Sequence, residues 1–407
     1  MTHMVVVGAG ECGTRAALSL REQGFDGDVT LLGSERHAPY ERPPLSKGGM
    51  LAEIFAAKTI AAETRLAEAG IAFRPSTSVE SIDRGDGRLA LSGGQALAYD
   101  RLLLATGATP RRLPGVDGER VVYLRTLEDA LYLREALRPG RHLIVIGGGF
   151  IGLEIAASAR ARGAEVTVVE AQPRLLARAV PEALAAILQQ RHVQSGVRVM
   201  VGARIEGIES DDSSVRVALA DGAVIEGDLL LVGIGAVPNV ALAEQAGLAI
   251  ENGIRVDERL ATEDGRIFAA GDCCSFPLAV YNGRRVRLES WRNAQEQGSL
   301  AAANMLGGRD AHGSVPWFWS DQYELGLQIA GLGDEGASSV TRDLGDGAQI
   351  LFHLAADGRL VAASGLGAGT AVAKDIRLSE MLIASAARPA VDALADPAVK
   401  LKSLLTR

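Results

Sequence analysis

Two glycine motifs are the part of this sequence whose spacing indicates chemistry. Both follow the pattern G-x-G-x-x-G, with Gly8, Gly10 and Gly13 in the first and Gly147, Gly149 and Gly152 in the second. In this pattern the first glycine makes a tight turn, the second lets a pyrophosphate approach the backbone, and the third lets a helix and a strand pack closely. The helix that follows offers unpaired N–H groups to the phosphates. The two motifs therefore predict two dinucleotide sites.

The residues around the first motif predict the elements that such a site needs. An apolar run at 4–7 predicts a buried strand, residues 14–23 predict a helix, and 29–32 predict a second strand. Glu35 follows that strand, where a carboxylate can bind ribose hydroxyls. A glycine triplet alone is more often a turn than a site. The flanking strands, the helix and the acid favour a dinucleotide site here.

The second motif lies in the same context. Residues 142–146 predict a strand, 153–162 a helix and 166–169 a further strand, which ends in Glu170. Glu170 is followed by Ala171 and Gln172, and no arginine comes next to accept a 2′-phosphate, so we expect NADH rather than NADPH. The repeated pattern indicates that a whole dinucleotide-binding unit has been duplicated.

Both units end in a similar strand and turn. The apolar run 101–105 leads into Thr106 and Gly107, and the run 229–232 leads into a turn that contains Gly235. Asp272 adds a third signal, because it follows a short predicted strand at 267–270 and a carboxylate there can reach a ligand across the sheet. If it stood alone, Asp272 would be interpreted as a turn residue.

Composition excludes several classes of protein. A chain of 407 residues with 47% hydrophobic content is expected to form two or three domains. The 42 basic residues against 50 acidic ones, formally −8, argue against a nucleic-acid-binding protein. The apolar stretch 229–243 is too short and too broken by glycine and proline to span a bilayer. A strand is predicted at once near the amino terminus, with no charged leader. We therefore expect a soluble, cytoplasmic protein with no membrane segment and no nucleic-acid partner.

The last ninety residues carry no glycine motif. They predict strands and then helices, at 328–331, 348–354, 360–364, 371–387 and 399–405. This order is typical of a small α+β domain. The expected fold class is therefore α/β, with two Rossmann-like dinucleotide-binding domains followed by a small α+β C-terminal domain.

Taken together, these motifs resemble those of the FAD-containing, NADH-dependent ferredoxin reductases of oxygenase systems, the putidaredoxin reductase-like family. The resemblance runs through nearly the whole chain in the family's order. Besides the two glycine motifs it is carried by Pro43-Pro44-Leu45-Ser46-Lys47, Ala105-Thr106-Gly107, Leu124-Arg125-Thr126-Leu127-Glu128-Asp129, Gly271-Asp272, Glu289-Ser290-Trp291 and Pro316-Trp317-Phe318-Trp319-Ser320-Asp321-Gln322. The tryptophan-rich segment and the Leu-Arg-Thr-Leu-Glu-Asp run are the most specific of these.

The resemblance implies a glutathione reductase-type architecture. The FAD domain would comprise 1–109 and 236–316, the NAD domain 110–235, and the C-terminal domain 317–407. It also implies FAD and NADH as cofactors and a flavin that releases electrons one at a time. The implied acceptor is a [2Fe–2S] ferredoxin, Rieske-type or vertebrate-type, which would serve a terminal oxygenase.

The resemblance implies residue roles as well. Lys47 would lie near the flavin N5/C4 edge, where a cation stabilises the anionic reduced ring. Glu154 would face the nicotinamide carboxamide, and Trp319 would lie close to the isoalloxazine. Asp272 would bind the ribityl chain. The further cofactor-binding candidates are Gly8, Gly10, Cys12, Gly13, Ser34, Glu35, Arg42, Val79, Thr106, Gly107, Arg125 and Trp291, and in the second unit Gly147, Gly149, Ile151, Gly152, Glu170 and Gly235. No metal ligand is expected.

One position departs from the family pattern. Many relatives have Gly-Asp where this chain has Gly33-Ser34, so Glu35 would be the ribose-binding acid one position later, or Ser34 would take part of that role. Both remain candidates.

The sequence lacks the cysteines that two related flavoenzyme activities use. Disulfide reductases of this architecture carry a C-x-x-x-x-C pair near the first unit, and NADH peroxidases a cysteine where this chain has Ser46-Lys47. The adjacent Cys273 and Cys274 are too strained for an easy disulfide. The alternatives left open are an NADH-dependent flavoprotein oxidase or peroxidase and a redox-sensing interaction protein resembling apoptosis-inducing factor. The six histidines are scattered and are interpreted as ordinary surface or loop residues.

An acidic ferredoxin needs a basic patch on a reductase that is itself acidic. Arg65, Arg292 and Arg309 are the candidate cations, and Arg309 is favoured because it precedes the segment 316–322.

Overall fold

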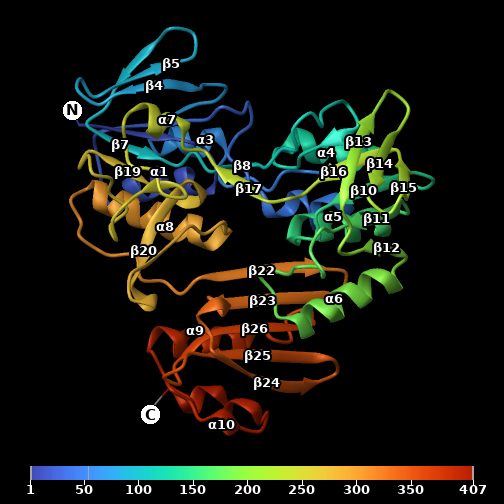
Figure 1. Ribbon diagram of the computed structural model, residues 1–407. Helices are drawn as coiled ribbons and strands as arrows, with labels where there is room; N and C mark the ends of the chain where they lie inside the picture. The colour runs from blue at the N-terminus through green and yellow to red at the C-terminus, as the bar shows by residue number, and fades with distance from the viewer. Residues whose placement is uncertain (1, 54, 406–407) are drawn as a thin grey trace. The chain divides into compact units, whose positions relative to one another are not determined.

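The computed structural model describes residues 2–53 and 55–405, which form two units built from segments that are not contiguous in sequence (Figure 1). The first unit comprises Met1–Glu41, Lys58–Thr109 and Val237–Pro316. The second comprises Arg42–Ala57, Pro110–Ala236 and Trp317–Arg407. The changes of unit near residues 109, 236 and 316 lie close to the expected domain boundaries, whereas the segment Arg42–Ala57, which was expected in the FAD domain, belongs to the second unit. The second unit holds both the expected NAD and C-terminal domains, so the three-domain division remains a prediction.

A parallel five-stranded sheet forms the centre of the first unit, in the order β19-β7-β1-β2-β3. Its strands are β1 His3–Val7, β2 Asp28–Leu32, β3 Ile71–Arg74, β7 Arg101–Leu104 and β19 Ile267–Ala269. Nearly continuous apolar runs form these strands because both faces of a parallel sheet are buried. Two helices, α1 (Glu11–Glu22) and α8 (Trp291–Met305), pack closely against each other. A Cβ on Gly298 would lie 2.4 Å from the carbonyl oxygen of Cys12, so this contact requires glycine.

Smaller elements complete the first unit. They are α3 Glu63–Glu68, α7 Ala241–Gln245, the antiparallel strands β4 Val79–Asp83, β5 Arg88–Leu91 and β6 Ala96–Ala98, and the set β18 Ile254–Arg255, β20 Cys274–Leu278 and β21 Arg284–Val286. Two short strands, β8 Ala108–Pro110 and β17 Ala236–Pro238, lie where the chain changes unit.

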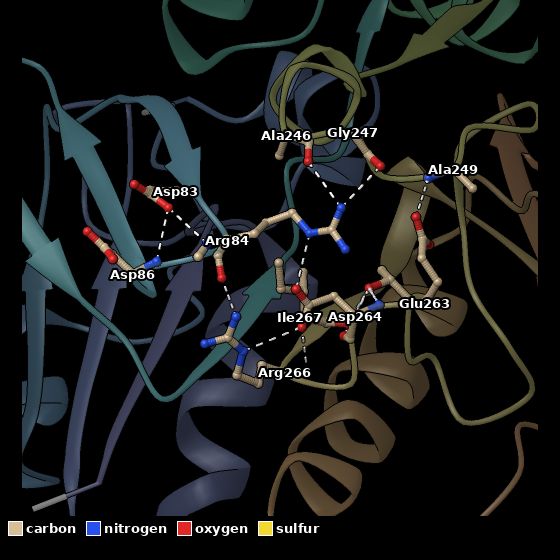
Figure 2. Close-up of polar contacts among 12 residues, drawn as sticks. Asp83, Arg84, Asp86, Ala246, Gly247, Ala249, Glu263, Asp264, Arg266 and Ile267 are labelled. Carbon is tan, nitrogen blue, oxygen red and sulfur yellow. Dashed lines mark hydrogen bonds and ion pairs between the residues drawn. The ribbon is translucent and has the colours of Figure 1, made fainter.

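Arg84 joins the β4–β6 sheet to the rest of the first unit (Figure 2). Its guanidinium donates to Asp264 at 3.1 Å and to the carbonyls of Ala246 and Gly247 at 3.3 and 3.2 Å. Arg266 donates in turn to the carbonyl of Arg84. These contacts bind the residues after α7 and the turn before β19 to one cation, so a polar cluster helps to hold the loops around this sheet.

The second unit contains a matching parallel sheet, in the order β12-β11-β10-β16-β9. Its elements are β9 Val121–Val122, α4 Leu127–Ala136, β10 His142–Ile146, α5 Phe150–Ala161, β11 Glu165–Val169, α6 Glu182–Gln194, β12 Val197–Met200 and β16 Leu229–Val232. Three antiparallel strands, β13 Ile205–Ser210, β14 Val215–Leu219 and β15 Val224–Gly227, pack on it. The duplicated dinucleotide-binding unit predicted from the sequence is thus present as two sheets of the same kind, which confirms the predicted mixed α/β fold.

The C-terminal part of the second unit is an antiparallel sheet in the order β22-β23-β26-β25-β24. Its elements are β22 Trp317–Gln322, β23 Leu325–Gly331, β24 Ser338–Gly345, β25 Ala348–Leu354, β26 Leu360–Ala368, α9 Ala373–Ala384 and α10 Val391–Ala395. The buried guanidinium of Arg342 holds the last turns to β24, because it donates to the carbonyls of Leu394, Ala393, Asp396 and Val399.

Several element boundaries differ from those predicted. Helices α1 and α5 begin at Glu11 and Phe150, three residues earlier than predicted, because the second glycine of each motif is already the N-cap. Residues 399–405 contain only a 3₁₀ turn, Leu401–Leu404, and α9 is shorter than the predicted 371–387. The expected loop 39–47 continues into a 3₁₀ turn, Pro43–Leu45, and the short helix α2, Gly48–Leu51.

Several elements were not predicted, and three of them, α8, α6 and β22, have a clear physical reason for it. Apart from Met305, the face that α8 buries is made of asparagine, glutamine, glycine and alanine, so its sequence lacks a clear apolar period. His192 occupies one position of the stripe that α6 buries and hides its period in the same way. In β22 two tryptophans and a phenylalanine do not alternate with polar residues. Within residues 2–53 and 55–405, no helix is long and apolar enough to cross a membrane.

Candidate functional site

Two glycines of the first motif lie against backbone atoms, and the third faces open space. Gly8 has φ +111°, and a Cβ there would lie 2.1 Å from the carbonyl oxygen of Ala105. A Cβ on Gly13 would lie 1.9 Å from the carbonyl oxygen of Gly8, so both positions exclude any other residue. A Cβ on Gly10, in contrast, would meet no atom within 4 Å. The space in front of Gly10 is therefore free for a ligand, as a dinucleotide pyrophosphate requires.

Helix α1 turns its amino terminus toward that space. Gly10 is its N-cap, and the first N–H bond made within the helix runs from Thr14 to the carbonyl of Gly10, at 3.0 Å. The N–H groups of Glu11, Cys12 and Gly13 are therefore not used by the helix itself, and such groups bind phosphate. This chain thus fits the pyrophosphate of FAD at the position that the sequence predicts.

Other candidates for FAD lie around this loop in the first unit. Glu35 accepts a hydrogen bond from the hydroxyl of Tyr40, whereas Ser34 is exposed. Thr106 is held by Asn239, which accepts from its hydroxyl at 2.7 Å and donates to its carbonyl at 2.8 Å. Val79 is half-buried on β4.

Asp272 and Trp291 complete the first unit's set. Asp272 lies in the 3₁₀ turn Gly271–Cys273, and the N–H of Gly271 donates to Gln297 at 2.7 Å. Trp291 is the first residue of α8, directly after its N-cap Ser290. Gln297 also lies on α8, so the turn and this helix are fixed to each other. The structure therefore brings the aspartate turn against the helix whose first residue is Trp291.

The three cysteines belong to the same unit and carry no relay. Cys12, Cys273 and Cys274 are all free and buried. Burial raises the pKa of each thiol. A nucleophilic cysteine requires the thiolate, which these surroundings disfavour.

The second glycine motif repeats the geometry of the first. Gly147 has φ +100°, and a Cβ there would lie 2.4 Å from the carbonyl oxygen of Gly233. A Cβ on Gly152 would lie 2.3 Å from the carbonyl oxygen of Gly147. At Gly149 the nearest protein atom would be 3.9 Å away, and at Gly235, with φ +107°, there would be none within 4 Å. The second loop thus fits a second dinucleotide.

Glu170 contacts the second loop directly. Its carboxylate accepts from the N–H of Gly148 at 2.6 Å and from the N–H of Gln172 at 2.7 Å. The acid is therefore fixed at the end of β11, beside the middle of the glycine motif. Ile151, in the first turn of α5, is 45% exposed.

Lys47 and Glu154 form the charged centre of the second unit. The Lys47 Nζ lies 3.6 Å from Oε1 of Glu154, and the Glu154 side chain is only 3% exposed. Ser46 donates to Oε2 of Glu154 at 2.5 Å and Ser320 to Oε1 at 2.6 Å. Burial raises the pKa of the Glu154 carboxyl, against the opposing effects of Lys47, Ser320 and Ser46.

Trp319 covers the same cation. The Lys47 Nζ lies 4.3 Å from the centre of the Trp319 ring, a cation–π contact. Trp319 stacks on Trp317, with ring centres 5.3 Å apart, and its Nε1 donates to Asp321 at 3.1 Å. Asp321 also lies 3.8 Å from the Lys47 Nζ. The three expected catalytic residues, Lys47, Glu154 and Trp319, are thus brought together, with Asp321 as a second acid.

Arg42 and Arg125 are also neighbours, because the guanidinium of Arg42 donates to the carbonyl of Arg125. The segment after Arg125 is fixed by a capping box, in which Thr126 caps α4 and Asp129 returns a bond to the backbone of Thr126. The threonine and the aspartate of the Leu-Arg-Thr-Leu-Glu-Asp run thus start helix α4.

Sequence reasoning missed three residues of the cluster around Lys47 and Glu154. Ser46, Ser320 and Asp321 stand inside the motifs that carried the resemblance, next to Lys47 and Trp319, so adjacency was the available signal. The sequence around His192 gave no signal of burial, and the interpretation of this histidine as an ordinary surface or loop residue is wrong. It is fully buried on α6, and His312 is also buried. Within the described residues no cluster of three or more histidine, cysteine, aspartate or glutamate side chains is able to hold a metal ion.

The fold and these two loops define a class: an oxidoreductase with two dinucleotide-binding domains of the same kind. Family comparison agrees, because residues 2–298 match the pyridine nucleotide-disulphide oxidoreductase model and residues 317–405 match a reductase C-terminal model. The chain belongs to the pyridine nucleotide-disulphide oxidoreductase family, and its cofactors are accordingly FAD and NAD(H).

Individual relatives narrow the class. The chain is 41% identical, over 98% of both chains, to the ferredoxin–NAD(+) reductase component of the anthranilate 1,2-dioxygenase system of Burkholderia cepacia. It is 40% identical to putidaredoxin reductase of Pseudomonas putida, covering 82% of this chain and 81% of that one. A crystal structure of a covalent putidaredoxin reductase–putidaredoxin complex superimposes with a TM-score of 0.94 at 34% identity, covering 100% of this chain and 98% of that chain. These similarities confirm the resemblance to the ferredoxin reductases of oxygenase systems that the sequence motifs indicated.

Proposed function

We propose that this protein takes a hydride from NADH onto FAD and passes single electrons to a [2Fe–2S] ferredoxin that serves an oxygenase. The similarity to the dioxygenase-system reductase supports it, because it covers 98% of both chains and therefore includes the C-terminal domain. The superposition on a reductase that was crystallised with its iron–sulfur partner supports the same acceptor.

The observation that carries the proposal is the set of side chains around Lys47. A serine and a lysine occupy the loop where a peroxidase would carry a cysteine, and they contact a buried carboxylate instead of a disulfide. The three thiols of the chain are buried, free and confined to the first unit. Because no thiol relay is built, electrons leave the flavin for an outside carrier.

We assign roles to the residues as follows. FAD supplies hydride acceptance and one-electron release when bound. Gly10 and the N-terminus of α1 bind its pyrophosphate, Glu35 its ribose and Asp272 its ribityl chain. Glu170 binds the ribose of NADH. FAD is also contacted, as the resemblance implies, by Arg42, Val79, Arg125 and Trp291.

Lys47, Glu154 and Trp319 serve the reacting rings. Lys47 stabilises negative charge on the reduced flavin, Glu154 orients the nicotinamide carboxamide, and Trp319 shields the cation from water. The contacts among the three support these roles, because the cation is held between a carboxylate and an aromatic ring.

We also propose that the protein acts in the cytoplasm and that its three-domain division follows the expected boundaries. The free thiols support a reducing compartment, since thiols persist where disulfides do not form. The separate match of residues 317–405 supports a C-terminal domain of its own.

A reconstituted assay tests the function. The FAD-loaded protein is supplied with NADH, cytochrome c and increasing amounts of putidaredoxin or of a Rieske-type ferredoxin. Cytochrome c reduction should rise and saturate with one of these iron–sulfur proteins, and NADH–ferricyanide turnover should proceed without them. If the rate of NADH consumption did not change with either ferredoxin, and one hydrogen peroxide formed for each NADH consumed, the protein would be an oxidase. If NADH were bound but hardly turned over with any acceptor, a sensing role would replace electron transfer.

A further inference from the structure

A buried row of hydrogen bonds leads from Glu154 into the second unit. The Ser320 hydroxyl lies 2.6 Å from Oε1 of Glu154, and Nε2 of Gln322 lies 3.1 Å from Oγ of Ser320. Nε2 of His192 lies 2.9 Å from Oε1 of Gln322, and the Tyr323 hydroxyl lies 3.2 Å from Nδ1 of His192. The row therefore links the buried carboxylate to a half-buried tyrosine.

The polar members are placed by two elements. Ser320 and Gln322 are two positions apart on β22, so they point to one face of the strand, and His192 lies near the end of α6. Ser320 and Gln322 are 1% exposed and His192 is 0% exposed. Burying three polar side chains is costly unless each is hydrogen-bonded, and here each has two partners in the row.

The direction of every bond in the row follows from its carboxylate end. An ionised carboxylate only accepts, so Ser320 donates its single hydrogen to Glu154. The Ser320 oxygen must then accept from the amide nitrogen of Gln322, which leaves the amide oxygen to accept from Nε2–H of His192. Nδ1 of His192 is thus unprotonated and accepts from Tyr323. All four bonds point toward Glu154, and such aligned bonds strengthen one another.

Charges around the row are compatible with a neutral imidazole. Lys47 and Asp321 face Glu154, and Arg191, Tyr323 and Glu324 surround His192. Arg191 forms an ion pair with Glu324 at 2.6 Å. Burial lowers the pKa of His192, with the Gln322 bond opposing it and Arg191 adding to it, so the ring is neutral at pH 7.

We propose that Ser320, Gln322 and neutral His192 are positioning residues that keep Glu154 ionised and correctly turned for the nicotinamide. Each of the three acts on Glu154 through the next residue of the row. The inference rests on the proposed role of Glu154, and it adds that this role depends on a histidine three hydrogen bonds away.

The pH profile of NADH oxidation by ferricyanide tests the row, with FAD-loaded enzyme and no ferredoxin. Ionised Glu154 should give kcat/KM for NADH an acidic limb. Ser320→Ala removes a bond to a charged group and should move that limb upward by about one pH unit. Gln322→Leu and His192→Phe should move it upward by a smaller amount. His192→Gln keeps an N–H donor and should restore the wild-type limb.

Glu154→Gln separates failure of this inference from failure of the role on which it rests. If the limb disappears in Glu154→Gln but stays at the wild-type pH in folded Ser320→Ala and His192→Phe, the row is only structural and the inference is overturned. If the limb persists in Glu154→Gln, Glu154 does not control NADH oxidation and both ideas are wrong. Because ferricyanide accepts the electrons, neither result bears on the identity of the ferredoxin.

A measurement on the unaltered protein tests the inference even if some variants do not fold. ¹⁵N NMR of the labelled holoenzyme reports the protonation of each ring nitrogen, with His192→Gln assigning the signal. We expect a neutral ring protonated at Nε2 at pH 7. A ring protonated only at Nδ1 would reverse the direction of the hydrogen bonds, and a ring protonated at both nitrogens would be charged. Either result would overturn the inference.

Discussion

The side-chain nitrogen of Lys47 lies 3.6 Å from a carboxylate oxygen of Glu154, and the two side chains are only 13% and 3% exposed. A cation and an anion so far removed from water depend on each other, because removing either one leaves an uncompensated buried charge.

Lys47→Met should therefore slow flavin reduction by NADH by at least about tenfold, or lower the reduction potential, while FAD stays bound. Stopped-flow reduction and a redox titration measure both quantities. Lys47→Arg keeps the charge and is the matched control. Unchanged kinetics and potential in the methionine variant would remove Lys47 from the site.

The pH dependence of stability should reveal the buried carboxyl. Burial raises the folded-state pKa of Glu154 above its unfolded value, so its contribution is fully present below the unfolded pKa and is lost as pH rises through the folded pKa. Glu154→Gln removes this dependence. The melting temperature of the variant minus that of wild type, both with FAD, should become more positive between pH 5 and pH 8. A constant difference would contradict burial of the charged form.

The glycines of the first motif offer a matched pair of substitutions. Gly10→Ala adds a methyl group that meets no protein atom, so the apoprotein should melt as wild type does while FAD affinity falls. Gly13→Ala places the same methyl group 1.9 Å from a carbonyl oxygen and should destabilise the apoprotein itself. Apoprotein melting and FAD titration distinguish the two. Equal FAD affinity in Gly10→Ala and wild type would place the pyrophosphate elsewhere.

Coenzyme choice should depend on Glu170. A carboxylate repels a 2′-phosphate, and a penalty of roughly 2 kcal/mol corresponds to about a thirtyfold preference for NADH in kcat/KM. Glu170 also accepts two backbone N–H bonds, so Glu170→Ala changes the loop as well as the charge. Glu170→Gln keeps one of the two acceptor oxygens, so it should narrow the coenzyme preference while disturbing the loop less than Glu170→Ala does. Equal efficiency of wild type with both coenzymes would refute the assignment.

Ferredoxin docking should respond to salt. An acidic partner and a reductase of formal charge −8 need a basic patch to associate, and such attraction weakens as ionic strength rises. Arg309 is exposed, whereas Arg292 is engaged with Glu296 at 3.0 Å. Arg309→Glu should therefore raise the KM for ferredoxin more than Arg292→Glu does, with the KM for NADH unchanged. A parallel loss of ferredoxin-dependent and ferricyanide activities with salt would exclude electrostatic docking.

The sequence predicted the structure best at positions where the local backbone geometry admits only one residue type. Gly8 and Gly147 stand at positive φ against a carbonyl, and no side chain fits there, so the glycine spacing together with the flanking strands and helices identified both loops. The central strands of the parallel sheets were found because both faces are apolar, whereas the edge strands β3, β9 and β12 were missed.

It predicted least where burial is achieved through polar groups. His192 and Gln322 are buried because of bonds that span more than a hundred residues of chain, and no local pattern reports such a bond. Helix α8 was missed for the same reason, since it buries Asn293 and Gln297 rather than leucines. The contacts around Glu154 came only from folding two distant segments onto α5.

The placement of the three cysteines has a practical consequence. Because all of them are shielded and all belong to the first unit, a thiol-reactive dye should label the native protein only as fast as that unit opens. Labelling rate thus becomes a reporter of opening in one unit, without engineered probes. FAD should slow that reaction if it closes the loop that contains Cys12, while opening of the second unit would leave the dye unreacted.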